Sequence, residues 1–316
     1  MNIYRVSYTS GKYVVKGYLA FPPRCHVSSE QLEQWMNPAQ SPELPLELIA
    51  QSMENPLPHW SGQKWPVFLY CRGGIGKVGS VKTKWLEDFA RHDQIVFAPC
   101  YRGNEGGQGR DEFGGADRED VFSAFRILQS LPCVNAEKIS VMGFSRGAVN
   151  AAELASGDDQ WTDAALHQRL SAGMNSIAKL SYVEQSEYHL LKSPLPRVYR
   201  LILWSGVSDL SQTYEERIEL RRMFKRVIGG TPHRLPQAYA DRSPLFMASA
   251  LPCPILVIHG TDDPQVDYSH GERMVAKLQE LALDVTFHTY EGYAHHFPEA
   301  VHQTAIQRMF QWISSN

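Results

Sequence analysis

The sequence predicts an α/β fold in which a mainly parallel central sheet carries helices on both faces. Six short, mostly apolar runs recur along the chain, and such continuous runs are typical of strands buried on both sides. Helical patterns separate the runs, and this alternation favours parallel strand pairing. A glycine-flanked serine follows the third run and precedes a helix-forming stretch, as in a strand–turn–helix unit. We expect residues 1–316 to form a single domain.

The chain begins with a predicted antiparallel hairpin. Residues 3–8 and 13–21 have strand character and are joined by a short turn. The next segment, residues 22–66, contains eight of the 19 prolines and has no sustained strand pattern. We therefore predict an irregular insertion there, with one short helix near residues 29–36.

The strands and helices of the main sheet follow in order. The apolar runs that we assign to strands are residues 67–71, 95–99, 139–142, 201–204, 255–258 and 285–290. Helical periodicity is found over residues 84–91, 117–130, 269–281 and 299–313, and near residues 213–227. A polar, helix-prone segment over residues 157–200 is longer than a simple connection requires. It predicts a helical cap over the carboxyl edge of the sheet, with a solvated helical excursion as the alternative.

Composition and charge exclude several classes of protein. Hydrophobic residues make up 43% of the chain, which is ample for a core, and the net charge is −3 with scattered basic residues. That distribution gives no footprint for a nucleic acid or an anionic membrane, and no run approaches membrane-spanning length. The five cysteines are odd in number and dispersed, and the N-terminus has no secretory pattern. We therefore expect reduced thiols and a cytoplasmic location.

The serine motif reads Gly143-Phe144-Ser145-Arg146-Gly147. The apolar run before it and the helix-forming run after it give the context of a nucleophile elbow, in which a sharp turn exposes the serine oxygen. Glycines at both ends allow the strand and the helix to approach within that turn. A glycine-containing turn with a capping serine is the alternative, because a single Gly-x-Ser-x-Gly match also arises by chance.

Candidates for an acid and a base occur late in the chain. A serine hydroxyl is a poor nucleophile at neutral pH, so it needs an imidazole as base and a carboxylate to orient that imidazole. The loop after the fifth apolar run contains Asp262 and Asp263, and the loop after the sixth contains His295 and His296. The carboxyl ends of parallel strands lie along one edge of a sheet, where ligands bind. The order serine, aspartate, histidine is that of the α/β-hydrolase fold.

At these residues the chain resembles the α/β-hydrolase catalytic domain of the prolyl oligopeptidase family, which includes dipeptidyl and acylaminoacyl peptidases. The resemblance covers the opening hairpin and residues 66–156 and 198–314. Its most specific segments are residues 101–110, 143–147, 259–266 and 292–297, and the triplet Arg242-Ser243-Pro244. We expect the family's β-propeller to be absent, because the hydrolase domain accounts for the 316 residues. The cap would then select the substrate.

Carried onto this sequence, the resemblance implies that Ser145 is the nucleophile, Asp263 the acid and His295 the base. Asp263 is preferred because the family's His-Gly-x-x-Asp-x-x-Val pattern matches residues 259–266.

Each assignment has a neighbouring alternative. Asp262 is the alternative acid, and is otherwise a turn residue. His296 is the alternative base, and is otherwise packed beside Phe297. A third candidate acid, Asp209, follows the fourth apolar run and more simply caps the helix near residues 213–227.

Acyl transfer also needs hydrogen-bond donors for the tetrahedral oxyanion. We expect one to be the backbone N–H of Arg146, and the other to be the backbone N–H of Gly74 or Ile75. Family members often have His-Gly-Gly or an oxyanion-binding tyrosine in that loop, whereas this chain has Arg72-Gly73-Gly74. Arg72 either contacts the substrate or holds the loop through backbone carbonyls. Phe144 is predicted to contact the substrate.

The remaining motifs are predicted to be structural. Residues 103–109 resemble a phosphate loop only in their glycine content, and Asp117 and Asp120 suit the start of a helix. The acid and base loops together hold two aspartates and two histidines, but catalysis explains these more simply than a metal does. We expect no metal and no cofactor.

The resemblance implies a serine hydrolase that cleaves amide or ester bonds of small peptides or acyl compounds through an acyl-enzyme. A carboxylesterase acting on small acyl esters is the first alternative. The alternative of another class is a non-catalytic binding protein on a hydrolase fold. The expected partner is a small-molecule or short-peptide substrate, with no nucleic acid and no membrane. The cleavage preference and the oligomeric state do not follow from the sequence.

Overall fold

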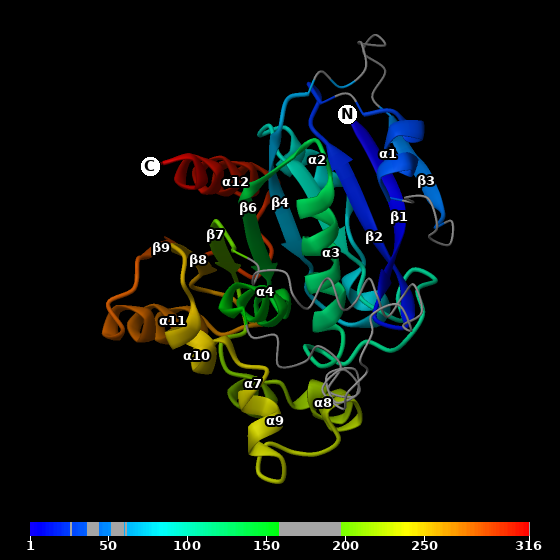
Figure 1. The fold of residues 1–316 in the computed structure, drawn as a ribbon. Helices are drawn as coiled ribbons and strands as arrows, with labels where there is room; N and C mark the ends of the chain where they lie inside the picture. Colours follow the sequence, from blue (N-terminus) through cyan, green and yellow to red (C-terminus); the bar gives the residue numbers. More distant parts are fainter. Residues whose placement is uncertain (26, 37–43, 52–59, 61, 158–196, 316) are drawn as a thin grey trace, which may run out of the picture.

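The computed structural model describes residues 1–25, 27–36, 44–51, 60, 62–157 and 197–315. The strands among them are β1 (Asn2–Ser10), β2 (Tyr13–Phe21), β3 (Leu46–Gln51), β4 (Trp65–Cys71), β5 (Ile95–Pro99), β6 (Val134–Phe144), β7 (Arg200–Trp204), β8 (Ile255–Gly260) and β9 (Val285–Tyr290). They form one sheet in the order β3-β1-β2-β5-β4-β6-β7-β8-β9 (Figure 1). The strands from β4 to β9 pair in parallel, and β1, β2 and β3 add antiparallel pairs at one side. The predicted fold class and the opening hairpin are confirmed.

Helices cover both faces of the sheet (Figure 1). One face carries α3 (Arg118–Ser130), α4 (Gly147–Ser156) and α11 (Ser269–Glu280), and the other carries α2 (Thr83–Ala90) and α12 (Glu299–Ser314). Strand β4 explains the continuous apolar runs. Its Val67 and Leu69 belong to the core of the first face, and Phe68 and Tyr70 belong to the core of the second. Successive side chains point to opposite faces, so both must be apolar where both faces are covered.

Shorter helices complete the described chain. They are α1 (Ser29–Met36), α7 (Leu210–Glu216), α8 (Arg221–Ile228), α9 (Pro236–Ala240) and α10 (Pro244–Met247), with 3-10 turns η1 (Gly76–Gly79), η3 (Ile218–Leu220) and η4 (Ala248–Ala250). Helices α7, α8 and α9 gather at the lower end of the molecule in Figure 1. They enclose a small third core that includes Phe113, Phe224 and Tyr239.

Two local predictions are wrong. The segment 22–66, predicted to lack strands, contributes β3, which pairs with β1 at the edge of the sheet. Leu48 and Ile49 of β3 are 42% and 39% exposed, so this edge strand lacks the buried apolar pattern by which a strand is recognised. The helix predicted near residues 213–227 is interrupted at Arg217, whose φ of −108° and ψ of 76° are not helical. The short helix predicted near residues 29–36 is confirmed as α1.

Parts of the predicted insertions lie outside the described residues. This holds for residues 158–196 of the predicted cap and for residues 26, 37–43, 52–59 and 61 of the predicted insertion.

No described helix has the length and apolar character needed to cross a membrane. All five cysteines are free and buried.

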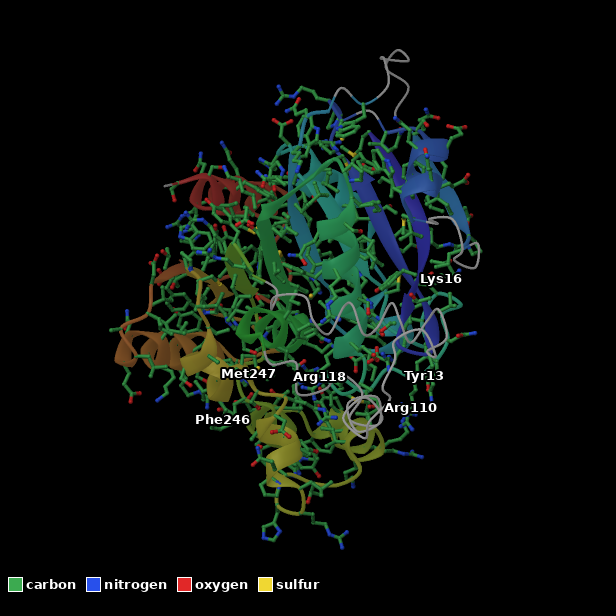
Figure 2. All side chains as sticks on the ribbon, viewed as in Figure 1. Tyr13, Lys16, Arg110, Arg118, Phe246 and Met247 are labelled. Carbon is green, nitrogen blue, oxygen red and sulfur yellow. The ribbon has the colours of Figure 1, made fainter. Side chains whose placement is uncertain are left out.

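The glycine-rich loop, residues 103–109, packs against the opening hairpin. The backbone N–H of Gln108 donates to the Val14 carbonyl at 2.8 Å, and the Gln108 side chain accepts from the Val14 N–H at 2.8 Å. The guanidinium of Arg102 lies over the Tyr13 ring, 5.1 Å from its centroid. Figure 2 shows Tyr13 and Lys16 at this end of the hairpin. The loop therefore packs on one end of the hairpin, in keeping with the prediction that it has a structural role.

Candidate active site

Ser145 occupies the sharp turn between β6 and α4. Its φ of +56° lies in the left-handed region, which costs a residue with a side chain roughly 1–3 kcal/mol. Several hydrogen bonds hold it there. Its N–H donates to the Trp204 carbonyl at 2.9 Å, and its carbonyl accepts the N–H groups of Ala148 and Val207 at 3.1 and 3.2 Å. The turn is therefore fixed from both β7 and α4.

The two glycines of the motif are required by close approach. A Cβ at Gly143 would overlap the backbone of Ala148 in the first turn of α4. A Cβ at Gly147 would overlap the carbonyl oxygen of Cys71 at the end of β4. The strand and the helix thus meet at a separation that only glycine permits, which is the geometry that the motif predicts.

Asp263 and His295 meet at the carboxyl ends of β8 and β9. Oδ2 of Asp263 lies 2.7 Å from Nδ1 of His295, and the two residues are 6% and 3% exposed. Oδ1 of Asp263 accepts the N–H groups of Gln265 and Val266 at 2.8 and 3.0 Å. The carboxylate is therefore held in one orientation with Oδ2 facing the imidazole. This arrangement assigns the proton of His295 to Nδ1 and leaves Nε2 free to act as a base.

The surroundings of Asp263 favour its ionised form. Burial alone would raise the pKa of Asp263, but hydrogen bonds from His259 and His295 and the backbone N–H of Val266 lower it well below its ordinary value. Nε2 of His259 lies 3.4 Å from Oδ2 of Asp263 and donates to the Val266 carbonyl at 2.9 Å. His259 thus contacts both Asp263 and Val266 and holds the loop between them, a role that the sequence analysis did not assign.

The neighbouring alternatives lie elsewhere. Asp262 is exposed and its Oδ1 accepts from the Thr261 hydroxyl at 3.0 Å, as expected of a turn residue. Oδ1 of Asp209 accepts the N–H groups of Ser211 and Gln212 at 2.9 and 3.2 Å, which confirms Asp209 as the cap of α7.

The prediction that His296 packs beside Phe297 is wrong. The His296 ring is exposed and contacts Phe144 and His295, each with ring centroids 5.2 Å apart. The backbone turns between His295 and Phe297, which directs Phe297 into the core against Trp204 and leaves His296 at the pocket. Phe144, predicted to contact the substrate, lies between the two histidines and Trp85.

Ser145 and His295 line the same pocket, which has a volume of about 260 Å³. One wall is apolar and comes from four separate segments, with Ile75, Phe113, Val207, Leu220, Met223 and Val266. The opposite wall is aromatic, with Tyr70, Trp85, Phe144 and His296. The sequence analysis did not foresee that Leu220 of η3 and Met223 of α8 line the first wall. These segments lie at least 60 residues from the serine motif, and only their amphipathic character suggests that they line a pocket.

The loop after β4 lies against Ser145. A Cβ at Gly73 would stand 2.9 Å from Cβ of Ser145, and Arg146, Gly74 and Ile75, the predicted oxyanion donors, line the same pocket. Arg72 is 2% exposed, and its Nη1 and Nη2 donate to the carbonyls of Gly73 and Cys100 at 3.0 and 2.7 Å. It therefore holds the loop through backbone carbonyls, and its contact with a substrate stays a prediction.

Asp117 and Asp120 lie at the start of α3, as the sequence predicts, and they also pair with buried arginines. Asp117 makes no capping hydrogen bond in α3, and its carboxylate lies 2.5 Å from Nη2 of Arg146. The Asp120 carboxylate lies 2.7 Å from Nη2 of Arg102. Buried carboxylates need such partners, since an unpaired charge in the interior is strongly unfavourable.

Comparisons with known proteins identify the family of the chain. The family model described as the prolyl oligopeptidase family matches residues 194–316, which include Asp263 and His295. A relative from Bacillus subtilis (strain 168), described as the uncharacterized peptidase YtmA, is 36% identical over 248 residues, covering 78% of this chain and 82% of the relative. The chain belongs to the prolyl oligopeptidase family. A shorter match is to a protein from Caenorhabditis elegans described as dipeptidyl peptidase family member 6. The two chains are 36% identical over 59 residues, which cover 19% of this chain and 8% of that protein.

Solved structures similar to this prolyl oligopeptidase family member confirm the α/β-hydrolase fold. A puromycin-hydrolyzing peptidase of Mycobacterium tuberculosis superposes with a TM-score of 0.65 at 19% identity, covering 98% of this chain and 38% of that chain. An acylaminoacyl peptidase of Pyrococcus horikoshii superposes with a TM-score of 0.64 at 15% identity, covering 98% and 40%. The chain thus spans less than half the length of these two structures.

Proposed function

We propose that this prolyl oligopeptidase family member is a serine peptidase acting on small peptides, with Ser145 as nucleophile, His295 as base and Asp263 as acid. The observation that carries the proposal is the 2.7 Å contact between Asp263 and His295 in a pocket shared with a serine at φ +56°. A buried carboxylate, an oriented imidazole and a strained, partly buried serine are the three side chains that a catalytic triad needs.

The reaction proceeds in two halves. Nε2 of His295 takes the proton of the Ser145 hydroxyl while Oγ bonds to the substrate carbonyl carbon, and the resulting oxyanion accepts from the N–H of Arg146 and of Gly74 or Ile75. The imidazolium, stabilised by Asp263, gives that proton to the leaving nitrogen as the C–N bond breaks. Water then attacks the acyl-enzyme, passes a proton to His295, and releases the acid as Ser145 regains its hydrogen.

The pocket supports a small, uncharged group on the acyl side of the cleaved bond. A volume of about 260 Å³ is at the lower end for ligand pockets, and its larger wall is apolar. No lining residue within the described ranges carries a carboxylate, whereas Lys82 and Arg217 bring positive charge to the rim. A free N-terminal ammonium close to the cleaved bond would have no acidic partner among the described residues that line the pocket. Acyl-blocked peptides with an apolar residue at the cleaved bond therefore fit better than free amines.

The first experiment tests the chemistry. A fluorophosphonate probe reacts only with an activated serine, so we expect the wild type to be labelled and Ser145→Ala to remain unlabelled. Equal labelling of the two proteins would rule out the assigned nucleophile.

The second experiment tests the substrate class. We expect acetyl-leucine nitroanilide to be turned over with a higher kcat/KM than leucine nitroanilide, and a short acyl nitrophenyl ester serves as the reference for esterase activity. Turnover of the ester with no turnover of either anilide would replace the peptidase by a carboxylesterase.

A further inference from the structure

Three consecutive carbonyl oxygens in the loop after β4 each accept a hydrogen bond from a buried side chain. The hydroxyl of Tyr101 donates to the Arg72 carbonyl at 3.1 Å, and Nη1 of Arg72 donates to the Gly73 carbonyl at 3.0 Å. Nη1 of Arg146 donates to the Gly74 carbonyl at 2.9 Å. The side chain of Arg72 itself and those of Tyr101 and Arg146 from two distant segments thus hold one short stretch of backbone.

These bonds set the directions of the N–H groups that follow. A trans peptide is planar, so its C=O and the N–H of the next residue point in opposite directions. Holding the three carbonyls therefore orients the N–H groups of Gly73, Gly74 and Ile75. Gly74 and Ile75 are the residues expected to supply the second oxyanion donor. Such donors are most effective when they are already oriented, because reorienting them during the reaction would cost free energy.

The three side chains form one stack, which we call the Arg–Tyr–Arg cluster (Arg72, Tyr101 and Arg146). The Tyr101 ring lies between two guanidinium groups, with Cζ of Arg72 at 4.7 Å and Cζ of Arg146 at 4.4 Å from its centroid. None of the three residues is more than 2% exposed. Tyr101 has a φ of +61°, a left-handed conformation that bulky residues rarely adopt and that Ser145 shares. Such conformations cluster at functional sites.

Two buried carboxylates fix Arg146. Its Nη2 lies 2.5 Å from Asp117 and 2.9 Å from Asp111, and its Nη1 donates to Asp111 at 3.0 Å. Asp117 is itself held by the N–H of Gly115 at 3.1 Å and by Nδ2 of Asn150 at 3.2 Å. Burial alone would raise the pKa of Asp117, but the Arg146 charge and these hydrogen bonds lower it below its ordinary value. Both Nη groups of Arg146 are therefore engaged by fixed acceptors within the protein.

We propose that the side chains of Arg72, Tyr101 and Arg146 are positioning residues that fix the oxyanion donors of Gly74 and Ile75. This inference rests on the serine hydrolase function proposed above. The three side chains act on the reaction through the backbone, so they raise kcat without binding the substrate. The chain departs from the family pattern at Arg72-Gly73-Gly74. In this proposal, the backbone of that stretch is held by buried side chains so that its N–H groups are oriented.

Tyr101→Phe tests the proposal with the smallest change. It keeps the ring next to both guanidinium groups and removes the hydroxyl, which donates to the Arg72 carbonyl and also contacts Cys71. Tyr8→Phe is its matched control. Tyr8 is 1% exposed, its hydroxyl donates to the Asp120 carbonyl at 3.0 Å, and it does not line the pocket.

Arg146→Lys is the second variant. It keeps the positive charge, but an ammonium lacks the planar fork that reaches the Gly74 carbonyl and both carboxylates at once. Arg102→Lys is its matched control, since Arg102 is likewise buried, paired with a buried aspartate and placed over a tyrosine ring. If Arg146→Lys fails to fold, Tyr101→Phe decides the question.

The measurements are kcat and KM for acetyl-leucine nitroanilide and the inhibition constant of a peptidyl trifluoromethyl ketone. The ketone forms a tetrahedral adduct with the serine and places an oxyanion among the donors. We expect kcat to fall about 10- to 100-fold in Tyr101→Phe and Arg146→Lys, with KM within about threefold of wild type. Ketone affinity should weaken by a similar factor, while both controls keep kcat and ketone affinity.

A rise in KM with unchanged kcat would mean that these side chains bind the substrate, and would overturn the positioning role. A loss of kcat with unchanged ketone affinity, or an equal loss in the controls, would overturn it as well. Failure of the serine hydrolase function looks different, because the wild type would then neither react with the fluorophosphonate nor hydrolyse the anilide or the nitrophenyl ester. If the wild type is active and both variants keep its kcat and ketone affinity, only the positioning role fails.

Discussion

Asp263→Asn replaces one carboxylate oxygen by an NH2 group and leaves the side chain nearly unchanged in size. Oδ1 of Asp263 accepts the N–H groups of Gln265 and Val266, so the amide oxygen of asparagine must take that position. The new NH2 group then faces Nδ1 of His295, which lies 2.7 Å from Oδ2 in the native protein. Two donors cannot share that contact, so the imidazole has to carry its proton on Nε2. That nitrogen then has no lone pair with which to accept the proton of Ser145.

We expect this exchange of tautomer to lower kcat on the order of 10,000-fold, as in triads where the same change has been made. At 1.36 kcal/mol per factor of ten, the loss corresponds to about 5 kcal/mol of transition-state stabilisation. KM should change by less than about threefold, because Asp263 does not line the pocket. Steady-state kinetics with acetyl-leucine nitroanilide and the rate of fluorophosphonate labelling measure the effect.

Asp262→Asn is the matched control for this prediction. Its carboxylate is exposed and accepts only from the neighbouring Thr261 hydroxyl among the hydrogen bonds of the described chain, so kcat should stay within about twofold of wild type. The reasoning is refuted if Asp263→Asn keeps kcat within tenfold of wild type, or if Asp262→Asn is the more damaging change. Thermal unfolding of both variants, measured alongside, separates lost chemistry from lost structure.

Two further predictions concern stability. Gly147→Ala should lower the free energy of unfolding by about 1–3 kcal/mol or more, because its Cβ would overlap the Cys71 carbonyl oxygen. Urea unfolding measures this, with Gly230→Ala as a control whose Cβ would lie closest to the partly exposed Leu235 side chain, which can move, and equal losses would contradict the steric argument. Burial raises the pKa of Glu153 to about 8 against the opposing charge of Arg118. The raised pKa stabilises the folded protein fully below about pH 4.5, and this stabilisation is lost as the pH rises through 8. The free energy of unfolding of the wild type should therefore fall relative to that of Glu153→Gln as the pH rises from 4.5 to 9, and parallel pH curves in urea unfolding would exclude this role.

The nucleophile turn was predictable because its determinants are local. An apolar strand, two glycines and a helix-forming run lie within about 20 residues, and each acts on its immediate neighbours. The contact between Asp263 and His295 was predictable for a different reason. Each follows a buried strand, and parallel strands bring their carboxyl ends to the same edge of the sheet.

The surroundings of the serine were not predictable in the same way. The carbonyl of Gly74 is 72 residues from the arginine that holds it, and Asp117 is 29 residues from the same guanidinium. No periodicity links these positions, and an aspartate before a helix is read most simply as a favourable charge at the helix start. The direction of His296 also escaped prediction, since it depends on a backbone turn between two neighbouring residues.

The sequence by itself determined which segments form strands and helices, the sharp turn at Ser145 and the two loops that carry the candidate acid and base, because apolar periodicity and glycine placement act over short ranges. Tertiary structure alone decided what surrounds them. Folding brings Arg72, Tyr101 and Arg146 into one buried stack and supplies part of a pocket wall from η3 and α8. Such contacts form because buried charges must find partners and apolar side chains must find cover, and those partners are set by packing rather than by distance along the chain.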